Sequence, residues 1–430
     1  MRSLSIAHGP VKVLALLHAA LAYDNGMARR PPMGWNSWCT DSLCNLAGHD
    51  PCNEHMVIST VDAMVAQGMP ELGYNYVTLD DCWSAKERDA SGNLQPEPRA
   101  FPNGIKYLAD YVHARGLYLG LYTCVGMKTC KGDRPGSFGH YEQDAKTLAG
   151  WGVDLVKMDH CGYPPGNHTD KELYGNMSAA LNATGRPMTF SLCSWGEASV
   201  WEWGAGVAQM YRIAMDHLPF FNLPSMAAGQ GLGQGTIQVA EWMAVLQPSL
   251  WSRPFGWMDP DFLMTLWGGT MDFIASRTEY SLWAMWSAPL LIATDVRNLT
   301  AEKASILLNK EAIAINQDAL AHAADRLRND SATGEQLWAR PLANGDRAVL
   351  LFHSCLPGGA PRTMNVSWAE LGWEAGARAA VRDIWAHEDR GVFSGGYTAV
   401  DISCRDVAFL RISKAAAVAN GTRHSVVPGK

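Results

Sequence analysis

The sequence is poor in charged residues and lacks several common functional motifs. Only 18% of its 430 residues are charged, the net charge is −7, and no basic block occurs, so we expect no nucleic-acid partner. No two cysteines have the CxxC spacing, which argues against zinc ribbons and thioredoxin-like redox sites. Neither HExxH nor GxSxG occurs, which excludes the corresponding metalloproteases and the common serine-hydrolase elbow.

The chain is rich in apolar residues, tryptophan and cysteine. Apolar residues make up 47% of it, and it has 17 Trp and 10 Cys, whereas average usage would give about five or six Trp. Length and composition predict a folded protein of two or three domains with a large core. The even number of cysteines is compatible with disulfides if the protein is exported.

The N-terminus is typical of a signal peptide over residues 1–22. An apolar run at 13–22 follows Arg2 and Lys12 and ends in a small-x-small pattern before Tyr23; an ordinary N-terminal helix is the alternative. Seven of the 18 asparagines lie in Asn-x-Ser/Thr sequons: Asn167, Asn176, Asn182, Asn298, Asn329, Asn365 and Asn420. We therefore expect a glycoprotein carrying N-glycans, either secreted or in the secretory-pathway lumen. Later apolar runs are too short for a membrane anchor.

Residues 31–317 alternate between short apolar runs and amphipathic stretches. Eight runs are predicted strands: Met33–Trp38, Tyr76–Leu79, Leu117–Tyr122, Leu155–Met158, Met188–Leu192, Gln209–Ile213, Phe255–Trp257 and Leu290–Ala293. Helical patterns lie at 57–65, Ile105–Ala114, Tyr141–Ala149, Lys171–Leu181, Val239–Leu246 and Ser281–Trp286. This α/β alternation predicts a (β/α)8 TIM barrel, with a doubly wound open sheet as the alternative.

After residue 318 the pattern changes to β-leaning runs separated by turn residues. The runs are Leu337–Arg340, Ala348–Phe352, Arg362–Val366, Ala380–Ile384, Tyr397–Ile402 and Val407–Ile412. They predict a C-terminal antiparallel β-sandwich over residues 318–414. The Ala/Gly-rich residues 415–430 are expected to form a mobile tail.

Carboxylates and aromatic residues follow the predicted barrel strands, at the end where barrels carry their active sites. The acidic residues are Asp80, Asp81, Asp159, Asp216, Asp259 and Asp261, and the aromatic ones are Trp38, Trp83, Tyr122, Trp195 and Trp257. Aromatic rings pack on the apolar face of a pyranose, and carboxylates bind its hydroxyls. Because no metal-ligand cluster accompanies them, we expect a sugar site that needs no metal or cofactor.

Cleavage of a glycosidic bond needs two carboxyl groups, and Asp159 and Asp216 form the better pair. Lys157 lies two residues before Asp159, and Arg212 lies four before Asp216. We expect the lysine to lower the pKa of a nucleophilic carboxyl, and burial among apolar groups to keep the acid protonated.

A structural role has to be weighed for each of these residues. A single aspartate after a strand most often caps a helix or closes a turn, but several at the strand ends of one barrel favour a site. His160 and His217 directly follow Asp159 and Asp216, and we interpret both as polar turn residues.

Longer motifs at these positions resemble the melibiase family, glycoside hydrolase family 27, over about residues 31–414. The motifs are Pro32–Trp38, Leu79–Trp83, Lys157–Cys161, Arg212 with Asp216, Trp257–Asp261, Trp283–Leu291 and Arg382–Trp385. The resemblance implies a retaining exo-α-galactosidase that hydrolyses terminal α-D-galactose from small or oligosaccharide galactosides by double displacement. An α-N-acetylgalactosaminidase and a non-catalytic galactose-binding lectin are the alternatives.

The resemblance also implies roles for individual residues. Asp159 matches the nucleophile and Asp216 the acid/base, with carboxyl groups about 5–5.5 Å apart. Asp80 and Asp81 match the pair that holds the O4 and O6 hydroxyls. The other matching sugar-binding positions are Trp38, Tyr122, Lys157, Ser194, Trp195, Arg212 and Asp261.

Disulfides are implied in the same way. The expected pairs are Cys130–Cys161, Cys44–Cys82 and Cys355–Cys404, with Cys39 and Cys52 as alternative partners of Cys82. The resemblance leaves Cys124 and Cys193 unassigned.

One loop departs from the usual family pattern. Where many family galactosidases have Cys-Glu-Trp, this chain has Cys193-Ser194-Trp195-Gly196-Glu197. A small Ser194 resembles the α-N-acetylgalactosaminidase branch, which needs room for an acetamido group. The bulky Glu197 favours a 2-hydroxyl, provided that its side chain points inward.

Overall fold

The computed structural model describes residues 22–40, 52–223, 233–355 and 358–415. The predicted signal peptide, except its last residue, and the predicted tail, except its first residue, lie outside this part of the chain. No helix within the described residues is long and apolar enough to span a bilayer.

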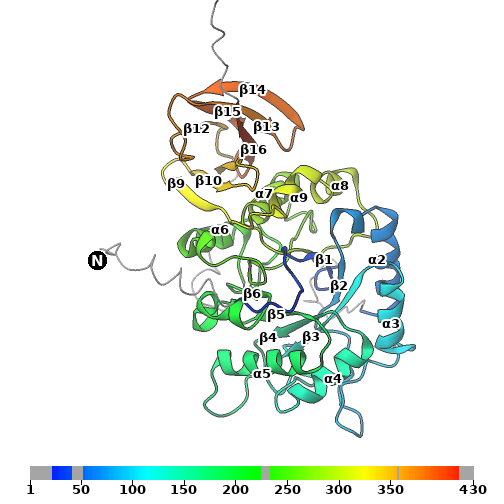
Figure 1. Cartoon of the computed structure of the whole chain (residues 1–430). Helices are drawn as coiled ribbons and strands as arrows, with labels where there is room; N and C mark the ends of the chain where they lie inside the picture. Colours follow the sequence, from blue (N-terminus) through cyan, green and yellow to red (C-terminus); the bar gives the residue numbers. More distant parts are fainter. Residues whose placement is uncertain (1–21, 41–51, 224–232, 356–357, 416–430) are drawn as a thin grey trace, which may run out of the picture.

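A parallel sheet of eight strands forms the larger part of the molecule (Figure 1). The strands are β1 (Met33–Asn36), β2 (Tyr76–Leu79), β3 (Tyr118–Cys124), β4 (Leu155–Asp159), β5 (Thr189–Cys193), β6 (Met210–Arg212), β7 (Trp257–Asp259) and β8 (Leu290–Ile292), in the order β7-β6-β5-β4-β3-β2-β1-β8. Leu263, just after β7, joins the two edges: its N–H donates to Leu291 O at 2.8 Å, and its carbonyl accepts from Ala293 N at 3.1 Å. The sheet thus closes as the predicted barrel.

Helices cover the outside of this barrel. They are α2 (Glu54–Ala66), α3 (Gly104–His113), α4 (Tyr141–Trp151), α5 (Asp170–Ala183), α6 (Thr236–Leu246), α7 (Phe273–Met285), α8 (Ala301–Leu307) and α9 (Lys310–Asn316). Capping side chains begin several of them: Asn53, Thr169 and Asp272 each accept a hydrogen bond from a first-turn N–H. All six predicted helical patterns overlap an observed helix, whereas we did not predict α8 and α9.

The C-terminal part is an antiparallel β-sandwich, as predicted. Its strands are β9 (Asp325–Asp330), β10 (Glu335–Pro341), β11 (Arg347–His353), β12 (Arg362–Ser367), β13 (Arg378–Asp383), β14 (Glu388–Ser394), β15 (Gly396–Ile402) and β16 (Val407–Lys414). Six of them form a sheet in the order β14-β13-β16-β11-β10-β9, and β12 pairs with β15. The core between the sheets includes Leu337, Val349, Met364, Trp368 and Leu410.

The sandwich packs on the barrel through α7 and the neighbouring helices (Figure 1). Trp286 at the end of α7 and Trp338 on β10 have ring centroids 5.6 Å apart. The buried Arg340 donates from Nη1 to Ser287 Oγ at 2.6 Å. Buried apolar residues from both parts belong to one continuous cluster, so the sandwich stabilises the barrel that it covers.

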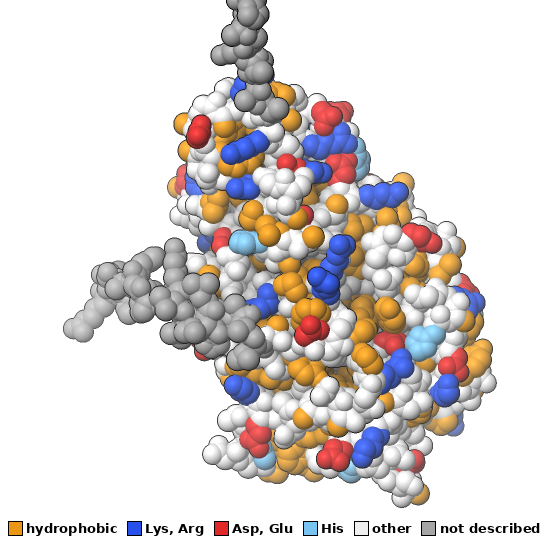
Figure 2. Space-filling model, viewed as in Figure 1, with side chains coloured by type: hydrophobic (Ala, Val, Ile, Leu, Met, Phe, Trp, Pro, Cys, Tyr) orange, Lys and Arg blue, Asp and Glu red, His pale blue; other side chains and the backbone are white. Residues whose placement is uncertain are grey.

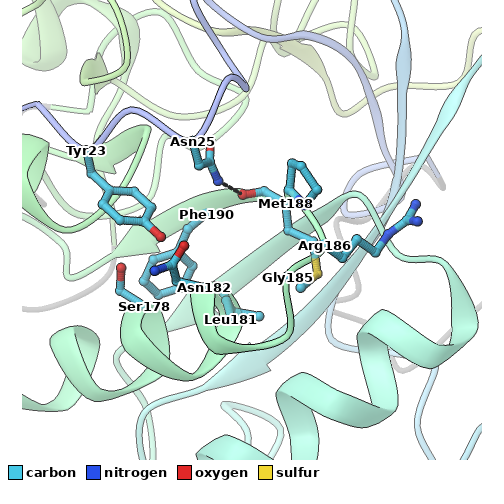
Figure 3. A pocket seen from close by; sticks show the side chains of 10 residues that line it. Tyr23, Asn25, Ser178, Leu181, Asn182, Gly185, Arg186, Met188 and Phe190 are labelled. Atoms are coloured by element: carbon cyan, nitrogen blue, oxygen red, sulfur yellow. Dashed lines mark hydrogen bonds between the residues drawn. The ribbon is translucent and has the colours of Figure 1, made fainter.

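The segment before β1 packs at the N-terminal end of the barrel. Tyr23 N donates to Ala205 O, and Asn25 Nδ2 donates to Met188 O, both at 2.8 Å. Beside it lies a cavity of about 180 Å³, shown in Figure 3, which Tyr23, Asn182 and Phe190 help to line. Because Met188 precedes β5, this cavity is at the opposite end of the strands from the predicted site. The face in Figure 2 shows acidic and basic side chains interspersed over its described surface.

Candidate active site

The ends of β2, β4, β6 and β7 bring acidic side chains into one cavity of about 460 Å³. Its lining consists of Trp38, Asp80, Cys130, Lys157, Asp159, Cys161, Trp195, Glu197, Arg212, Met215, Asp216, Asp261 and Phe262. Both predicted catalytic residues lie in this lining, and so do most of the predicted sugar-binding residues. The exceptions are Asp81, Tyr122 and Ser194.

An ion pair forms the part of the cavity next to β2. Lys157 Nζ donates to Asp80 Oδ2 at 2.8 Å, and Asn36 Nδ2 donates to the same oxygen at 3.0 Å. The ammonium group also lies 4.9 Å from the ring centroid of Phe262 and 5.3 Å from that of Tyr122. Burial alone would lower the pKa of Lys157, but the carboxylate of Asp80 outweighs it and raises the pKa. The lysine is therefore a permanent cation in this wall.

Asp159 ends β4, and fixed donors hold its buried carboxylate. Tyr122 Oη donates to Oδ2 at 3.0 Å, and the backbone N–H of His160 donates to Oδ1 at 2.9 Å. Burial raises the pKa of Asp159, while the charge of Lys157 opposes that shift without contacting the carboxylate. We expected the lysine to lower the pKa of Asp159, and its charge does act in that direction. The net shift is nevertheless upward, because the ammonium group is bonded to Asp80 and the effect of burial is larger.

Arg212 connects the carboxylates that follow β6 and β7. Its Nη2 lies 3.1 Å from Asp216 Oδ1 and 3.0 Å from Asp261 Oδ2. The side chain of Asp216 is 42% exposed, whereas that of Asp261 is 4% exposed. Burial raises the pKa of Asp261 to about 7, against the lowering effect of Arg212. The expectation that Asp216 is buried among apolar groups is therefore wrong, because Asp261 occupies the inner side of the guanidinium and leaves Asp216 at the cavity mouth.

The three predicted residues outside the lining lie behind it. Tyr122 reaches the site through its hydroxyl on Asp159. Asp81 Oδ2 accepts from Lys131 N at 3.0 Å, and burial raises the pKa of Asp81 to about 6. The side chain of Ser194 is completely buried, because the chain directs this residue into the protein where β5 ends.

Trp195 and Glu197 line the cavity from the same loop that buries Ser194. Trp195, Ala198 and Ser199 have φ angles of 56°, 50° and 51°. This left-handed backbone conformation is unfavourable for most residues other than glycine. Such strain is common at functional sites. Sequence reasoning placed Trp195 here and made the role of Glu197 conditional on its direction; the structure places Glu197 at the cavity.

Sequence reasoning missed Met215 and Phe262 as lining residues. Each is adjacent to a predicted aspartate, Asp216 or Asp261, so their place after a barrel strand was a usable signal. Asp261 itself has a φ of 86°, and this turn brings Phe262 over Lys157.

Disulfides join loops at this end of the barrel. Cys130 is bonded to Cys161, as the resemblance implied, and the Cys130 sulfur lies 3.2 Å from Asp159 Oδ2. Cys82, beyond β2, is bonded to Cys52 and not to Cys44. Cys52 lies just before α2, which places its Cα 5.9 Å from that of Cys82, while Cys44 is outside the described residues.

The remaining cysteines differ in state. Cys39 is disulfide-bonded, and Cys355 is bonded to Cys404 in the sandwich. Cys124 and Cys193 are buried free thiols. Within the described residues, Cys130, Asp159 and Cys161 form the one cluster with metal-ligand spacing, but sulfurs in a disulfide are not the thiolates that a metal requires.

Comparison with known proteins gives consistent results over both parts of the chain. A family model described as alpha galactosidase A matches residues 30–318, and one described as the alpha galactosidase C-terminal beta sandwich domain matches residues 332–412. An α-galactosidase of Oryza sativa subsp. japonica is 38% identical over 366 residues, which cover 85% of this chain and 81% of that protein.

Solved structures show the same likeness. The crystal structure of α-galactosidase I from Mortierella vinacea has a TM-score of 0.83 at 33% identity, covering 91% of this chain and 98% of that one. A structure of an α-galactosidase from Saccharomyces cerevisiae with raffinose has a TM-score of 0.82 at 27% identity, covering 91% and 99%. The chain therefore belongs to the melibiase family, glycoside hydrolase family 27.

Proposed function

We infer that this protein is a retaining exo-α-galactosidase, which releases terminal α-D-galactose from galactosides. The observation that carries this function is the one cavity that Asp159 and Asp216 both line, together with the Asp80–Lys157 ion pair. Two carboxyl groups in one cavity are the requirement for glycoside hydrolysis. The α-galactosidase relatives, one of them solved with raffinose, support α-galactosides such as raffinose as the substrate class.

In the proposed first step, a carboxylate oxygen of Asp159 forms a bond to the anomeric carbon as the glycosidic C–O bond breaks. Asp216 gives its proton to the departing oxygen. In the second step, Asp216 takes a proton from water, whose oxygen bonds to the anomeric carbon while the bond to Asp159 breaks. Two inversions leave galactose in its original α configuration, and Asp216 regains the proton that it lost.

The groups that bind the sugar are proposed from the contacts of the cavity. Asp80, held by Lys157, offers a charge-assisted acceptor for sugar hydroxyls, and Trp38 and Trp195 offer aromatic faces. Arg212 and Asp261 form the wall beside Asp216. We also keep Asp81 in this role, because its buried Oδ1 has no hydrogen-bond partner among the described residues and can accept one from a hydroxyl.

Glu197 favours galactose over N-acetylgalactosamine as the bound sugar. Glu197 is one of the residues that line the cavity, whereas the small Ser194, which would leave room for an acetamido group, is buried and is not among them. The lectin alternative is disfavoured because both carboxyl groups required for catalysis are in place.

The function is tested by assaying p-nitrophenyl α-galactoside beside p-nitrophenyl α-N-acetylgalactosaminide. We expect turnover of the first, and α-galactose as the first product seen by proton NMR. Release of β-galactose, or turnover of the second substrate alone, would refute the assignment. Glu197→Ala should relax the preference between the two sugars, while Glu202→Ala, an exposed glutamate five residues further on, should leave it unchanged.

We propose the secretory pathway as the compartment of this enzyme. The signal-like N-terminus and the disulfides support it. The six sequon asparagines within the described residues are all exposed, as N-glycans require. Mass spectrometry of glycopeptides from the exported protein tests this proposal, and unmodified peptides at all sequons would contradict it.

A further inference from the structure

His217 is buried behind the carboxylates of the cavity, although we interpreted it from sequence as a polar turn residue. Its exposed fraction is 1%. The loop after β6 carries both Asp216 and His217, and α6 and the loop after β7 cover it. The backbone N–H of His217 donates to Asp261 Oδ2 at 2.8 Å. The residue therefore lies between the two carboxylates that Arg212 joins.

Both ring nitrogens of His217 have polar partners on other elements. Nδ1 lies 2.9 Å from the carbonyl oxygen of Phe262, and Nε2 lies 3.2 Å from Thr236 Oγ1 at the start of α6. A carbonyl oxygen only accepts, so we assign the proton to Nδ1 and let Nε2 accept from the threonine hydroxyl. Burial lowers the pKa of His217 to about 4, which agrees with a neutral ring.

Helix α7 also packs against the imidazole of His217. Glu279 Oε1 lies 3.7 Å from His217 Nδ1 and accepts from Met264 N at 2.8 Å. The ring of Trp283 lies at a centroid distance of 5.2 Å from the imidazole and is tilted by 42° to it, and its Nε1 donates to Asp261 O at 2.8 Å. The imidazole is thus fixed by groups from α6, α7 and the loop after β7.

We propose that His217 is a positioning residue, whose imidazole holds the Asp216 loop against the Asp261 loop and so directs the Asp216 carboxyl toward the glycosidic oxygen. The inference rests on the proposed function, because it takes Asp216 as the acid/base. The half-exposed Asp216 side chain is bonded to Arg212, so its direction depends on where the backbone of its loop is held. His217 is the next residue along that backbone.

The leaving group distinguishes positioning from a general structural role. An alkoxide needs a proton from Asp216 as the glycosidic bond breaks, whereas 2,4-dinitrophenolate leaves without one. A misplaced Asp216 therefore slows methyl α-galactoside hydrolysis selectively. A loss of folded protein lowers kcat/KM for both substrates by the same factor.

The experiment compares His217→Leu with His217→Asn, whose amide N–H can replace the Nδ1 donor. We expect His217→Leu to lower kcat/KM about 100-fold for methyl α-galactoside and less than about 5-fold for 2,4-dinitrophenyl α-galactoside. His217→Asn should recover most of the loss. The matched control is His353→Leu in the sandwich. His353 is also buried, and its Nδ1 lies 3.1 Å from the carbonyl oxygen of Ile402. This variant should change kcat/KM by the same factor for both substrates.

Equal losses on the two substrates, or no loss on either, would overturn the proposal. If His217→Leu does not fold, Thr236→Val takes its place, because it removes the partner of Nε2 and should produce a weaker loss of the same selectivity. Wild-type protein that cleaves neither galactoside would instead refute the proposed function, so the two failures are distinguishable.

Discussion

Lys157 is bonded to Asp80 and not to Asp159, although it lies two residues from Asp159 on the same strand. The Nζ–Oδ2 distance is 2.8 Å, and both side chains are almost fully buried. Lys157 therefore neutralises the carboxylate proposed to bind sugar hydroxyls. Asp159 accepts hydrogen bonds from Tyr122 and the His160 N–H instead, so the two carboxylates have different hydrogen-bond partners, although the charge of Lys157 still lowers the pKa of Asp159.

Removal of this cation should destabilise the protein. Lys157→Met leaves the Asp80 carboxylate buried without its counter-charge, which we expect to cost about 3–5 kcal/mol of unfolding free energy. Activity on p-nitrophenyl α-galactoside should also fall sharply. Urea unfolding measures the first effect. The control Lys106→Met breaks an ion pair whose side chains are 63% and 62% exposed and should cost less than about 0.5 kcal/mol; equal costs would contradict the prediction.

Removal of the proposed nucleophile should separate binding from turnover. Asp159→Asn keeps the shape of the side chain and its acceptor oxygen but cannot form the glycosyl-enzyme bond. We expect kcat to fall by more than about 10⁴-fold, while galactose still binds with an affinity within about tenfold of wild type. Nitrophenol release and calorimetry measure the two quantities. Full activity of this variant would refute the role of Asp159, and Asp110→Asn on the exposed face of α3 serves as the control.

The barrel and the strand-end position of its site were predictable because both signals are local. Each strand is a short apolar run, and the polar residue after it marks the end of the barrel where the site lies. The eight observed barrel strands each overlap a predicted one. The boundaries differ by a few residues, as at Phe255, whose φ of 65° delays β7 until Trp257.

The features that could not be predicted from the sequence depend on contacts between distant parts of the chain. Lys157 and Asp80 meet across the barrel interior, where side chains from alternate strands share a layer, and no local pattern indicates that partner. Likewise, no local pattern indicates that Cys52 is the disulfide partner of Cys82, or which groups bury His217. Strands β9 and β14 were missed because they are the edges of the six-stranded sheet; their exposed, charged residues lack the apolar alternation of inner strands.

The disulfide beside Asp159 should affect activity more than the one in the sandwich. Replacing Cys130 and Cys161 by serine frees the two loops that flank the carboxylate, and the Cys130 sulfur lies 3.2 Å from Asp159 Oδ2. We expect a loss of about 2–4 kcal/mol of stability and a large loss of kcat. Replacing Cys355 and Cys404 should cost comparable stability and leave kcat of the folded enzyme unchanged. Equal kcat in both double variants would contradict the prediction.

Glu279 should contribute more to the stability of the protein in acid than at neutral pH. Burial raises its pKa from 4.5 to about 8, so the folded state binds this proton more tightly than the unfolded state does. Its contribution to stability is therefore fully present below about pH 4.5 and is lost as the pH rises through about 8. Glu279→Gln removes the titration, and its amide oxygen can still accept from Met264 N.

The measurement is the difference in unfolding free energy between Glu279→Gln and wild type across this pH range. We expect it to be small at pH 4.5 and then to widen in favour of the variant by up to about 1.4 kcal/mol per pH unit, until about pH 8. Asp81 and Asp261, whose pKa values burial also raises, are unchanged in both proteins, so their effects cancel in the difference. Glu302→Gln on the exposed face of α8 serves as the matched control. A difference that stays constant with pH would mean that Glu279 does not exchange its proton on unfolding in this range.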